Sequence, residues 1–285
     1  MPELPEVETM VRGVGPGMIG RTVAAFEACP CACRPISMTP RLATISKRLQ
    51  GTKILELSRI GKRIVFLHDS GDRLVIEPRM TGLLLIDDPP DVEHLRLEWT
   101  LGGRKSPGKI RFWDRRGLGT CTLYNATQWE QWLREDRLGP DALAMSPADW
   151  IARFAPSTTE IKVALLDQKR IAGIGNLYAS EILHRSAIHP QSRCCDLSSG
   201  DYERIARATA EILETAIRYE GSTLGDGTYR NALNQSGSYQ NHHSVYAKQN
   251  EPCHTCGNTP IIRIVQAQRA TFYCPGCQKK KRRRR

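Results

Sequence analysis

The sequence predicts an α+β protein with an N-terminal antiparallel β-sandwich, a C-terminal helical domain and a short β-hairpin ribbon held by four cysteines. Three observations predict this class. Short β-rich runs fill residues 20–125, helical periodicity begins near residue 147, and two CxxC pairs stand near the end of the chain. With 285 residues, the chain can form two compact domains and a small module.

The first 125 residues predict one short helix followed by strands. In LPEVETMVRG, residues 4–13, apolar Leu4, Val7 and Val11 recur at spacings of three and four, and a glycine ends the run. The β-rich runs KRIVFLHD, GDRLVIEP, EHLRLEWTL and GTCTLY follow, separated by turn clusters such as DSGD and LGGRKSPG. Short strands at this spacing are typical of an antiparallel sandwich.

The second half of the chain is predicted to be helical. Candidate helices are SPADWIARFA, EIKVALLDQ, NLYASEILHRS and GDYERIARATAEILETAIRYEG, the last with one apolar stripe and a stop at Gly221. Residues 221–241 are rich in Ser, Asn and Gln and predict a mobile loop. We therefore place a sandwich domain at 1–135, a helical domain at 136–245, a ribbon at 246–278 and a basic tail at 279–285.

Composition favours an intracellular protein with a polyanionic partner. The net charge of +11 suits nucleic acid, although an anionic membrane surface or a merely basic protein would also fit. No apolar run approaches the roughly 18 residues that a membrane span needs. The start MPELPEVETM is acidic where a signal peptide is basic, so we expect a cytoplasmic location.

Four of the ten cysteines predict a metal site. Cys253 and Cys256 form one CxxC pair, and Cys274 and Cys277 form another seventeen residues later. Two such turns joined by the hairpin-like IIRIVQAQRATFY can surround one Zn²⁺ at about 2.3 Å per Zn–S bond. Four thiolates leave no position for water, so this Zn²⁺ is expected to be structural. The alternative to a DNA-contacting ribbon is a zinc-stapled protein-interaction module.

Other basic and cysteine-rich segments are less specific. Cys29, Cys31 and Cys33 lie in CPCAC, where a second metal site and ordinary cysteines of a surface loop both remain open. The tail Lys279 to Arg285 either adds sequence-independent affinity for phosphates or is simply solvated.

The amino terminus carries a possible nucleophile. Removal of Met1 would expose Pro2 as a secondary amine, and α-amino groups titrate near pH 8. A neutral amine can attack an electrophilic sugar carbon and form an iminium link, and the adjacent Glu3 could move protons. The alternative is an ordinary helix start with solvated acidic residues.

Several motifs in order resemble one family. MPELPEVET, LGPDAL, IKVALLDQKRIAGIGNLYASEIL and the CxxC–CxxC ribbon are similar to segments of the formamidopyrimidine-DNA glycosylase and endonuclease VIII family. The resemblance spans nearly the whole chain. It implies an N-terminal β-sandwich, a helical domain with a helix–two-turn–helix element, a zinc ribbon, and DNA bound in the cleft between the domains.

The resemblance assigns roles near the damaged base. It implies Pro2 as nucleophile, Glu3 as the acid/base that opens the ribose ring, and Glu6 as a second acidic residue near the base. It also implies that Lys62, in SRIGKRIVF, lies at a hairpin tip and contacts phosphate near the lesion. Without the family, Lys62 would be interpreted as an exposed strand lysine.

Two further residues would hold the DNA backbone. Gly173 and Gly175 allow a tight turn, after which Asn176 is expected to cap the next helix and leave a phosphate seat at its N-terminus. Arg269 matches the ribbon arginine of the family, so Lys62, Asn176 and Arg269 would together hold a kinked strand.

Three residues match the family's void-filling set. Met80 and Arg116 fit two of the places, and Leu118 stands where the family has phenylalanine. Leucine can still wedge into a base step but cannot stack as an aromatic ring does. Outside the family context, Met80 and Leu118 would be interpreted as core residues.

The implied function is base excision repair of double-stranded DNA that contains damaged bases or abasic sites. A bifunctional DNA glycosylase/AP lyase would remove oxidised purines, namely 8-oxoguanine and formamidopyrimidines, and then cut the strand by β,δ-elimination. An endonuclease VIII-like enzyme for oxidised pyrimidines and a non-catalytic binder of damaged DNA remain alternatives. One lesion needs only a monomer. Loop 221–241 is where the family recognises the extruded base, and its centre aligns poorly, which leaves the preferred lesion open.

Overall fold

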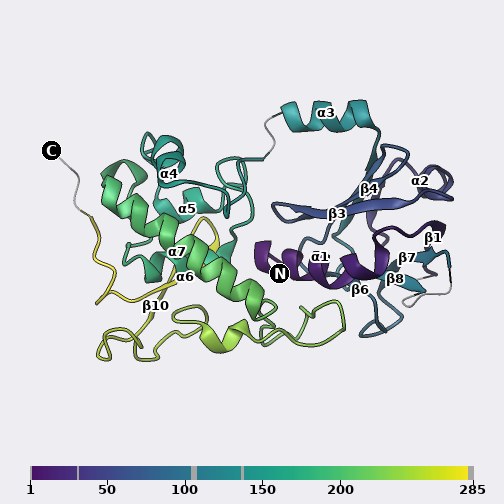
Figure 1. Cartoon of the computed structure of the whole chain (residues 1–285). Helices are drawn as coiled ribbons and strands as arrows, with labels where there is room; N and C mark the ends of the chain where they lie inside the picture. Colours follow the sequence, from purple (N-terminus) through teal and green to yellow (C-terminus); the bar gives the residue numbers. More distant parts are fainter. Residues whose placement is uncertain (1, 31, 104–107, 136–137, 282–285) are drawn as a thin grey trace. The chain divides into compact units, whose positions relative to one another are not determined.

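The computed structural model describes residues 2–30, 32–103, 108–135 and 138–281. Backbone contacts divide the chain into two compact units (Figure 1). The first contains Met1–Asp136 together with Ile217–Gln240, and the second contains Arg137–Ala216 together with Asn241–Arg285. The segment that follows the longest helix therefore belongs with the N-terminal residues, although it lies in the predicted helical domain by sequence.

The first unit contains two sheets. Their strands are β1 (Val23–Ala28), β2 (Ser37–Thr39), β3 (Ile54–Ile60), β4 (Arg63–His68), β5 (Arg73–Glu77), β6 (Gly82–Leu85), β7 (Leu95–Leu101), β8 (Lys109–Asp114) and β9 (Thr120–Tyr124). The four-stranded sheet has the order β1-β7-β8-β6, and the five-stranded sheet has the order β2-β9-β5-β4-β3. Neighbours pair antiparallel except β2 with β9, which are parallel. This one departure from a purely antiparallel sandwich is possible because a long stretch of chain separates the two strands.

An aromatic cluster joins the two sheets. The Trp99 ring, from β7, lies 5.5 Å from Phe66 of β4 in a stacked arrangement and 4.9 Å from Phe26 of β1. All three side chains are almost fully buried, as are most apolar residues of both inner faces. Burial of aromatic rings from both sheets is what holds a sandwich together, and the predicted sandwich is confirmed.

Helix α1 (Leu4–Met18) covers this core and extends further than the sequence predicts. Gly13 does not end it, because the glycine serves close packing: a Cβ at this position would lie 2.5 Å from the Cβ of Ala232. Gly13 thus lets the segment 217–240 approach the helix. Helix α2 (Leu42–Leu49) packs beside β1. A further helix, α3 (Ala126–Arg134), was not predicted from the sequence.

The second unit is helical and carries the ribbon. It contains α4 (Pro147–Phe154), α5 (Ile161–Leu165), α6 (Asn176–Arg185), the 3₁₀ turn η1 (Cys194–Asp196), most of α7 (Ser199–Arg218), and the hairpin β10 (Ile262–Gln266) and β11 (Arg269–Tyr273). The residues of a second 3₁₀ turn, η2 (Tyr239–His242), are divided between the two units. All four predicted helices form, although α5 is shorter than its apolar pattern. Among the described residues, no helix is both long and apolar enough to cross a bilayer.

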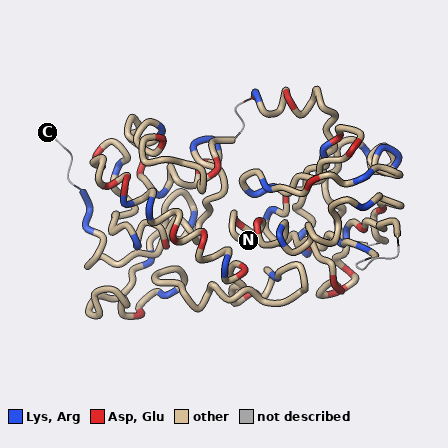
Figure 2. The backbone as a smooth tube through the Cα atoms, in the orientation of Figure 1, with Lys and Arg blue, Asp and Glu red and all other residues tan. Residues whose placement is uncertain are grey.

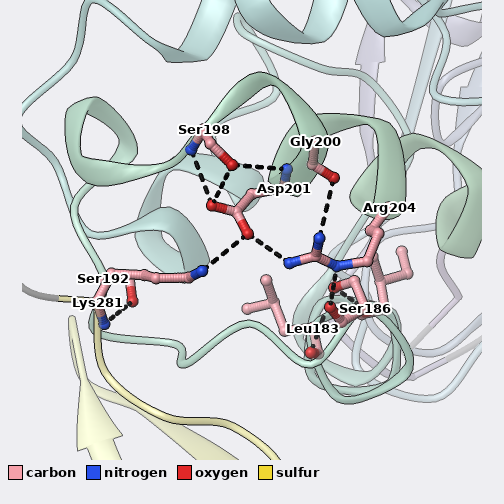
Figure 3. Close-up of polar contacts among 9 residues, drawn as sticks. Leu183, Ser186, Ser192, Ser198, Gly200, Asp201, Arg204 and Lys281 are labelled. Atoms are coloured by element: carbon pink, nitrogen blue, oxygen red, sulfur yellow. Dashed lines mark hydrogen bonds and ion pairs between the residues drawn. The ribbon is translucent and has the colours of Figure 1, made fainter.

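A buried carboxylate joins the start of α7 to the beginning of the basic tail (Figure 3). Asp201 Oδ2 accepts hydrogen bonds from the Ser198 amide and hydroxyl, both at 2.8 Å, while its Oδ1 pairs with Arg204 and with Lys281 Nζ at 3.1 Å. Lys281 is therefore docked on the protein and is not a freely solvated charge. Residues 282–285 of the tail lie outside the described part.

We predict that Gly13→Ala destabilises the protein. The added methyl group meets Ala232, and overpacking of this kind costs about 1–3 kcal/mol. Thermal unfolding measures the change. Gly15→Ala is the matched control, since its Cβ would meet only Ile19 Cδ1 at an ordinary 3.6 Å. Equal melting temperatures for the two variants would contradict the packing argument.

We also predict a pH-dependent contribution from Asp201. Burial alone would raise the pKa of this carboxyl, but the Ser198 and Lys281 hydrogen bonds lower it on balance. A lowered pKa stabilises the folded state at pH values above the unfolded pKa of about 4, and this stabilisation fades as pH falls through the folded value. Asp201→Asn should therefore melt below wild type at pH 7, with the gap shrinking below about pH 4. Glu203→Gln, on the exposed side of α7, is the control. A gap independent of pH would contradict the prediction.

Candidate functional site

The N-terminal residues are fixed by a buried acid. Pro2 is buried, and Glu3 and Glu6 are only 3% and 2% exposed. Glu6 Oε2 accepts a hydrogen bond from the Glu3 amide at 2.9 Å, which sets the backbone conformation where α1 begins. The three residues predicted to act on the damaged nucleotide thus lie together at one helix start.

Glu6 also binds the segment that follows α7. Its second oxygen, Oε1, accepts a hydrogen bond from the Ser222 amide at 2.9 Å. Gly221 has φ +78°, and a Cβ there would lie 2.9 Å from Glu6 Oε1. Loop 221–241, which the sequence predicts to be mobile, is therefore held at its first residues by a hydrogen bond to Glu6.

Tyr229 supports the same junction. Its hydroxyl donates to the Glu220 carbonyl at 3.0 Å and lies 3.5 Å from the Glu6 carbonyl. Full burial raises the pKa of Tyr229 well above its ordinary value, and the Glu6 carboxylate adds to the shift, so the phenol stays neutral. Sequence reasoning missed this residue, because nothing local marks a tyrosine within a polar loop as buried.

Lys62 lies at a hairpin tip, as the resemblance implies. It follows Gly61 in the two-residue turn between β3 and β4, where Ile60 pairs with Arg63. Arg59 holds the turn: its guanidinium donates to the Gly61 carbonyl at 2.9 Å and pairs with Glu8 of α1 at 2.8 Å. The hairpin is thereby anchored to the helix whose start is fixed by Glu6.

Two of the predicted void-filling side chains lie together. Arg116 Nη1 is 2.9 Å from the Met80 sulfur, and Met80 is 38% exposed, so it is not a core residue. Leu118 is half-buried and follows Gly117, whose φ of +60° forms the bend between Arg116 and Leu118.

Asp114 organises this loop, although sequence reasoning did not single it out. Its fully buried carboxylate accepts hydrogen bonds from the Gly119 amide at 2.7 Å, the Arg116 amide at 3.2 Å and the Thr81 hydroxyl. The loop after β8 and the turn after β5 share this acceptor. The relative positions of Met80, Arg116 and Leu118 therefore depend on one aspartate.

In the second unit, Asn176 does not cap a helix as predicted. Gly175 is the N-cap of α6, and Asn176 is its first helical residue. The Asn176 side chain is instead used in tertiary contacts: Oδ1 accepts from Lys162 Nζ at 2.6 Å, and Nδ2 donates to the Ala270 carbonyl at 2.9 Å. The predicted tight turn is present, since Gly173 has φ +109°.

Lys162 is another residue that sequence reasoning did not single out. It is fully buried in α5, and besides Asn176 it donates to the Ala270 carbonyl at 3.3 Å. A lysine inside the apolar run IKVALL was the available signal, because a buried charge needs a specific partner.

Arg269 is exposed at the start of β11, opposite Gln266 across the hairpin turn. Since Ala270 follows it directly, the hydrogen bonds from Asn176 and Lys162 fix the strand that carries Arg269. Asn176 and the strand that carries Arg269 are thus held together through the Ala270 carbonyl, whereas Lys62 belongs to the other unit.

The four ribbon cysteines form a zinc-binding site. Their sulfur atoms all lie within 4.8 Å of one another, with Cys253–Cys277 at 3.8 Å and Cys256–Cys274 at 3.6 Å. Tetrahedral Zn–S bonds of about 2.3 Å require sulfurs roughly 3.8 Å apart, so the set fits Zn²⁺. Four protein ligands complete the coordination of the ion, so the site is structural.

Positive charge is distributed along the whole chain. Figure 2 shows Lys and Arg in both units, interspersed with Asp and Glu, and an unbroken run of lysines at the described C-terminal end. Within the described part of the first unit, Lys and Arg are scattered and do not gather in one long run. Contacts with a polyanion would therefore come from individually placed residues.

This combination defines a class of DNA glycosylase: an N-terminal Pro-Glu on a sandwich, a helical unit and a four-cysteine ribbon. Three family profiles match in order: the formamidopyrimidine-DNA glycosylase N-terminal domain over residues 1–121, its H2TH domain over 138–227, and the zinc finger found in FPG and IleRS over 250–280. The chain belongs to the formamidopyrimidine-DNA glycosylase family, and the resemblance and fold class predicted from the sequence are confirmed.

Known relatives match almost the whole chain. The chain is 38% identical to formamidopyrimidine-DNA glycosylase of Solibacter usitatus and 36% identical to that of Gluconobacter oxydans, in each case over 98% of this chain and 100% of the relative. The Lactococcus lactis Fpg complex with DNA containing an abasic site matches with a TM-score of 0.85 and 31% identity over 98% of this chain and 100% of that one. MutM (Fpg) from Thermus thermophilus matches with a TM-score of 0.84 and 32% identity over 99% and 100%.

We predict that Asp114→Asn loosens the loop that carries Arg116 and Leu118. The amide NH₂ would face a backbone donor, and a buried donor left unsatisfied costs about 1–3 kcal/mol. Hydrogen exchange at the Arg116 and Gly119 amides should accelerate, and the melting temperature should fall. Asp87→Asn, at an exposed position, is the control. Unchanged exchange at both amides would contradict the assignment.

Proposed function

We propose that this enzyme, a DNA glycosylase for oxidised purines, is bifunctional and uses the secondary amine of Pro2 as its nucleophile, with Glu3 as acid/base. The observation that carries the proposal is the pair of hydrogen bonds on Glu6, which fix the Glu3 backbone and the Ser222 backbone around one carboxylate. Such a junction presents the N-terminal residues in one defined geometry, which nucleophilic attack requires.

The reaction begins once Met1 has been removed. The unprotonated Pro2 nitrogen attacks C1′ of the damaged nucleotide. The C1′–N bond to the base breaks, and the base leaves with the bonding electron pair and takes up the proton that the Pro2 nitrogen loses. Glu3 donates a proton to the ribose ring oxygen, so that the ring opens and C1′ becomes an iminium carbon bonded to Pro2. Loss of a C2′ proton then expels the 3′ phosphate, and a second elimination expels the 5′ phosphate.

The supporting residues are assigned to DNA. Lys62, Asn176 and Arg269 contact backbone phosphates, and Met80, Arg116 and Leu118 enter the void left by the extruded nucleotide. Glu6 holds the loop beside the base. Zn²⁺, bound by Cys253, Cys256, Cys274 and Cys277, fixes the hairpin that presents Arg269.

The partner is duplex DNA with damaged bases or abasic sites, and the enzyme acts as a monomer beside the nucleoid in the cytoplasm. A single lesion engages one set of the residues above, so no second subunit is required. An enzyme for oxidised pyrimidines and a non-catalytic DNA-binding protein are the two alternatives that the sequence left open, and one assay distinguishes the proposed mechanism from both.

Borohydride trapping tests the mechanism. The protein is incubated with duplexes that carry 8-oxoguanine, a formamidopyrimidine, an oxidised pyrimidine or an abasic site, and is then reduced. We predict covalent adducts with the purine lesions and the abasic site, and a drop of at least about tenfold in trapping rate for Pro2→Gly, equivalent to about 1.4 kcal/mol in the barrier.

Two controls make the result specific. An undamaged duplex of the same sequence should give no adduct, and protein that retains Met1, identified by mass spectrometry, should give none because its Pro2 nitrogen is an amide. Undiminished trapping by Pro2→Gly would contradict the assignment of Pro2 as the nucleophile. Binding of lesion duplex with no adduct at all would favour the non-catalytic interpretation, and trapping confined to the pyrimidine duplex would favour the endonuclease VIII-like one.

A further inference from the structure

A second cluster of metal-binding side chains lies in the sandwich unit, apart from the ribbon. Cys33, from the cysteine-rich segment that precedes β2, meets Glu93 and His94, which directly precede β7. One potential ligand atom from each residue lies within 4.8 Å of the other two. The Cys33 sulfur is 3.8 Å from Glu93 Oε1.

These three side chains offer a sulfur, a nitrogen and an oxygen ligand. Ligands bound tetrahedrally at about 2.0–2.3 Å from a common ion lie roughly 3.5 Å apart, so small side-chain rotations would close the cluster around a cation. Thiolate and imidazole favour zinc and similar transition metals over Mg²⁺ or Ca²⁺. Three protein ligands leave a fourth position for water.

Asp91 orients the histidine. Its Oδ1 lies 2.8 Å from His94 Nδ1 and accepts hydrogen bonds from the His94 amide at 2.8 Å and from Trp113 Nε1 at 3.2 Å. A carboxylate on one ring nitrogen fixes the tautomer and leaves Nε2 with its lone pair, the arrangement found behind metal-bound histidines. Three hydrogen bonds on one oxygen hold Asp91 itself in place.

We propose that Cys33, Glu93 and His94 bind a second transition-metal ion of the zinc class, with Asp91 as the residue that positions His94. This site is distinct from the four-cysteine ribbon, and it gives the CPCAC segment a function. Cys29 is not among the clustered ligands, and Cys31 lies outside the described residues, so the proposed ligand set includes neither.

The site joins two segments that support the Arg116–Leu118 loop. The His94 carbonyl accepts the Asp114 amide at 3.0 Å, and the Arg34 carbonyl lies 2.6 Å from where a Cβ of Gly117 would stand. A metal ion that ties residue 33 to residues 93 and 94 therefore braces this loop from two sides. The consequence for lesion probing rests on the proposed function, but metal binding itself does not.

Metal content tests the site without any DNA substrate. The full-length protein is loaded with Zn²⁺, freed of excess metal by gel filtration, and measured by elemental analysis. Wild type should carry two ions per chain, one in the ribbon and one here, while Cys33→Ser and Glu93→Gln should carry one. Glu93 is exposed, so we expect its substitution to leave the fold intact. Asp91→Asn should weaken binding of the second ion by about 10- to 100-fold.

Matched cysteines provide the controls. Cys29→Ser removes a thiol from the same segment and should retain two ions. Zn²⁺ should slow alkylation of Cys33 and leave alkylation of the exposed Cys195 unchanged. A single ion in wild type, with Cys33 unprotected, would overturn the proposal, as would two ions in both Cys33→Ser and Glu93→Gln.

Discussion

Both carboxylate oxygens of Glu6 accept backbone hydrogen bonds, one from Glu3 and one from Ser222, inside an almost fully buried junction. A buried carboxylate is costly unless it is hydrogen-bonded, and two backbone amide donors offset part of that cost here. The start of α1 and the segment after α7 are therefore held to each other by one side chain. The proposed chemistry at Pro2 depends on this constraint, as does the position of the loop.

The same kind of support recurs at two other places where the proposed mechanism presents a side chain to DNA. Asp114 gathers the amides behind Arg116, and Lys162 joins Asn176 to the strand that bears Arg269. In each case a buried charged group satisfies the backbone or side chain next to an exposed residue. Precise placement of flexible, exposed side chains thus rests on buried polar groups, which have few alternative partners in a low-dielectric interior.

Local pattern was sufficient for most of the architecture. Strand runs, the amphipathic stripe of α7 and the CxxC spacing each depend on residues close in sequence, so they could be recognised and are confirmed. The parallel pairing of β2 with β9 could not be recognised, because strand order depends on contacts across the whole domain. The observed end of α1 differs from the predicted one for a similar reason. Gly13 does not end the helix; a glycine stands there because Ala232, far away in the sequence, packs against that position.

The sequence alone determined which residues are available for the proposed chemistry: the Pro2–Glu3 start, the four zinc ligands, Lys62 and the order of the family motifs. The Pro2–Glu3 pair and the CxxC pairs are short-range features, whereas the hairpin position of Lys62 was implied by the family resemblance. Only the tertiary structure decided which groups share an environment. The Glu6–Ser222 contact spans 216 residues of chain, and the Cys33–Glu93 contact spans 60. Such pairs leave no local periodicity, because folding brings them together through the packing of elements that lie between them.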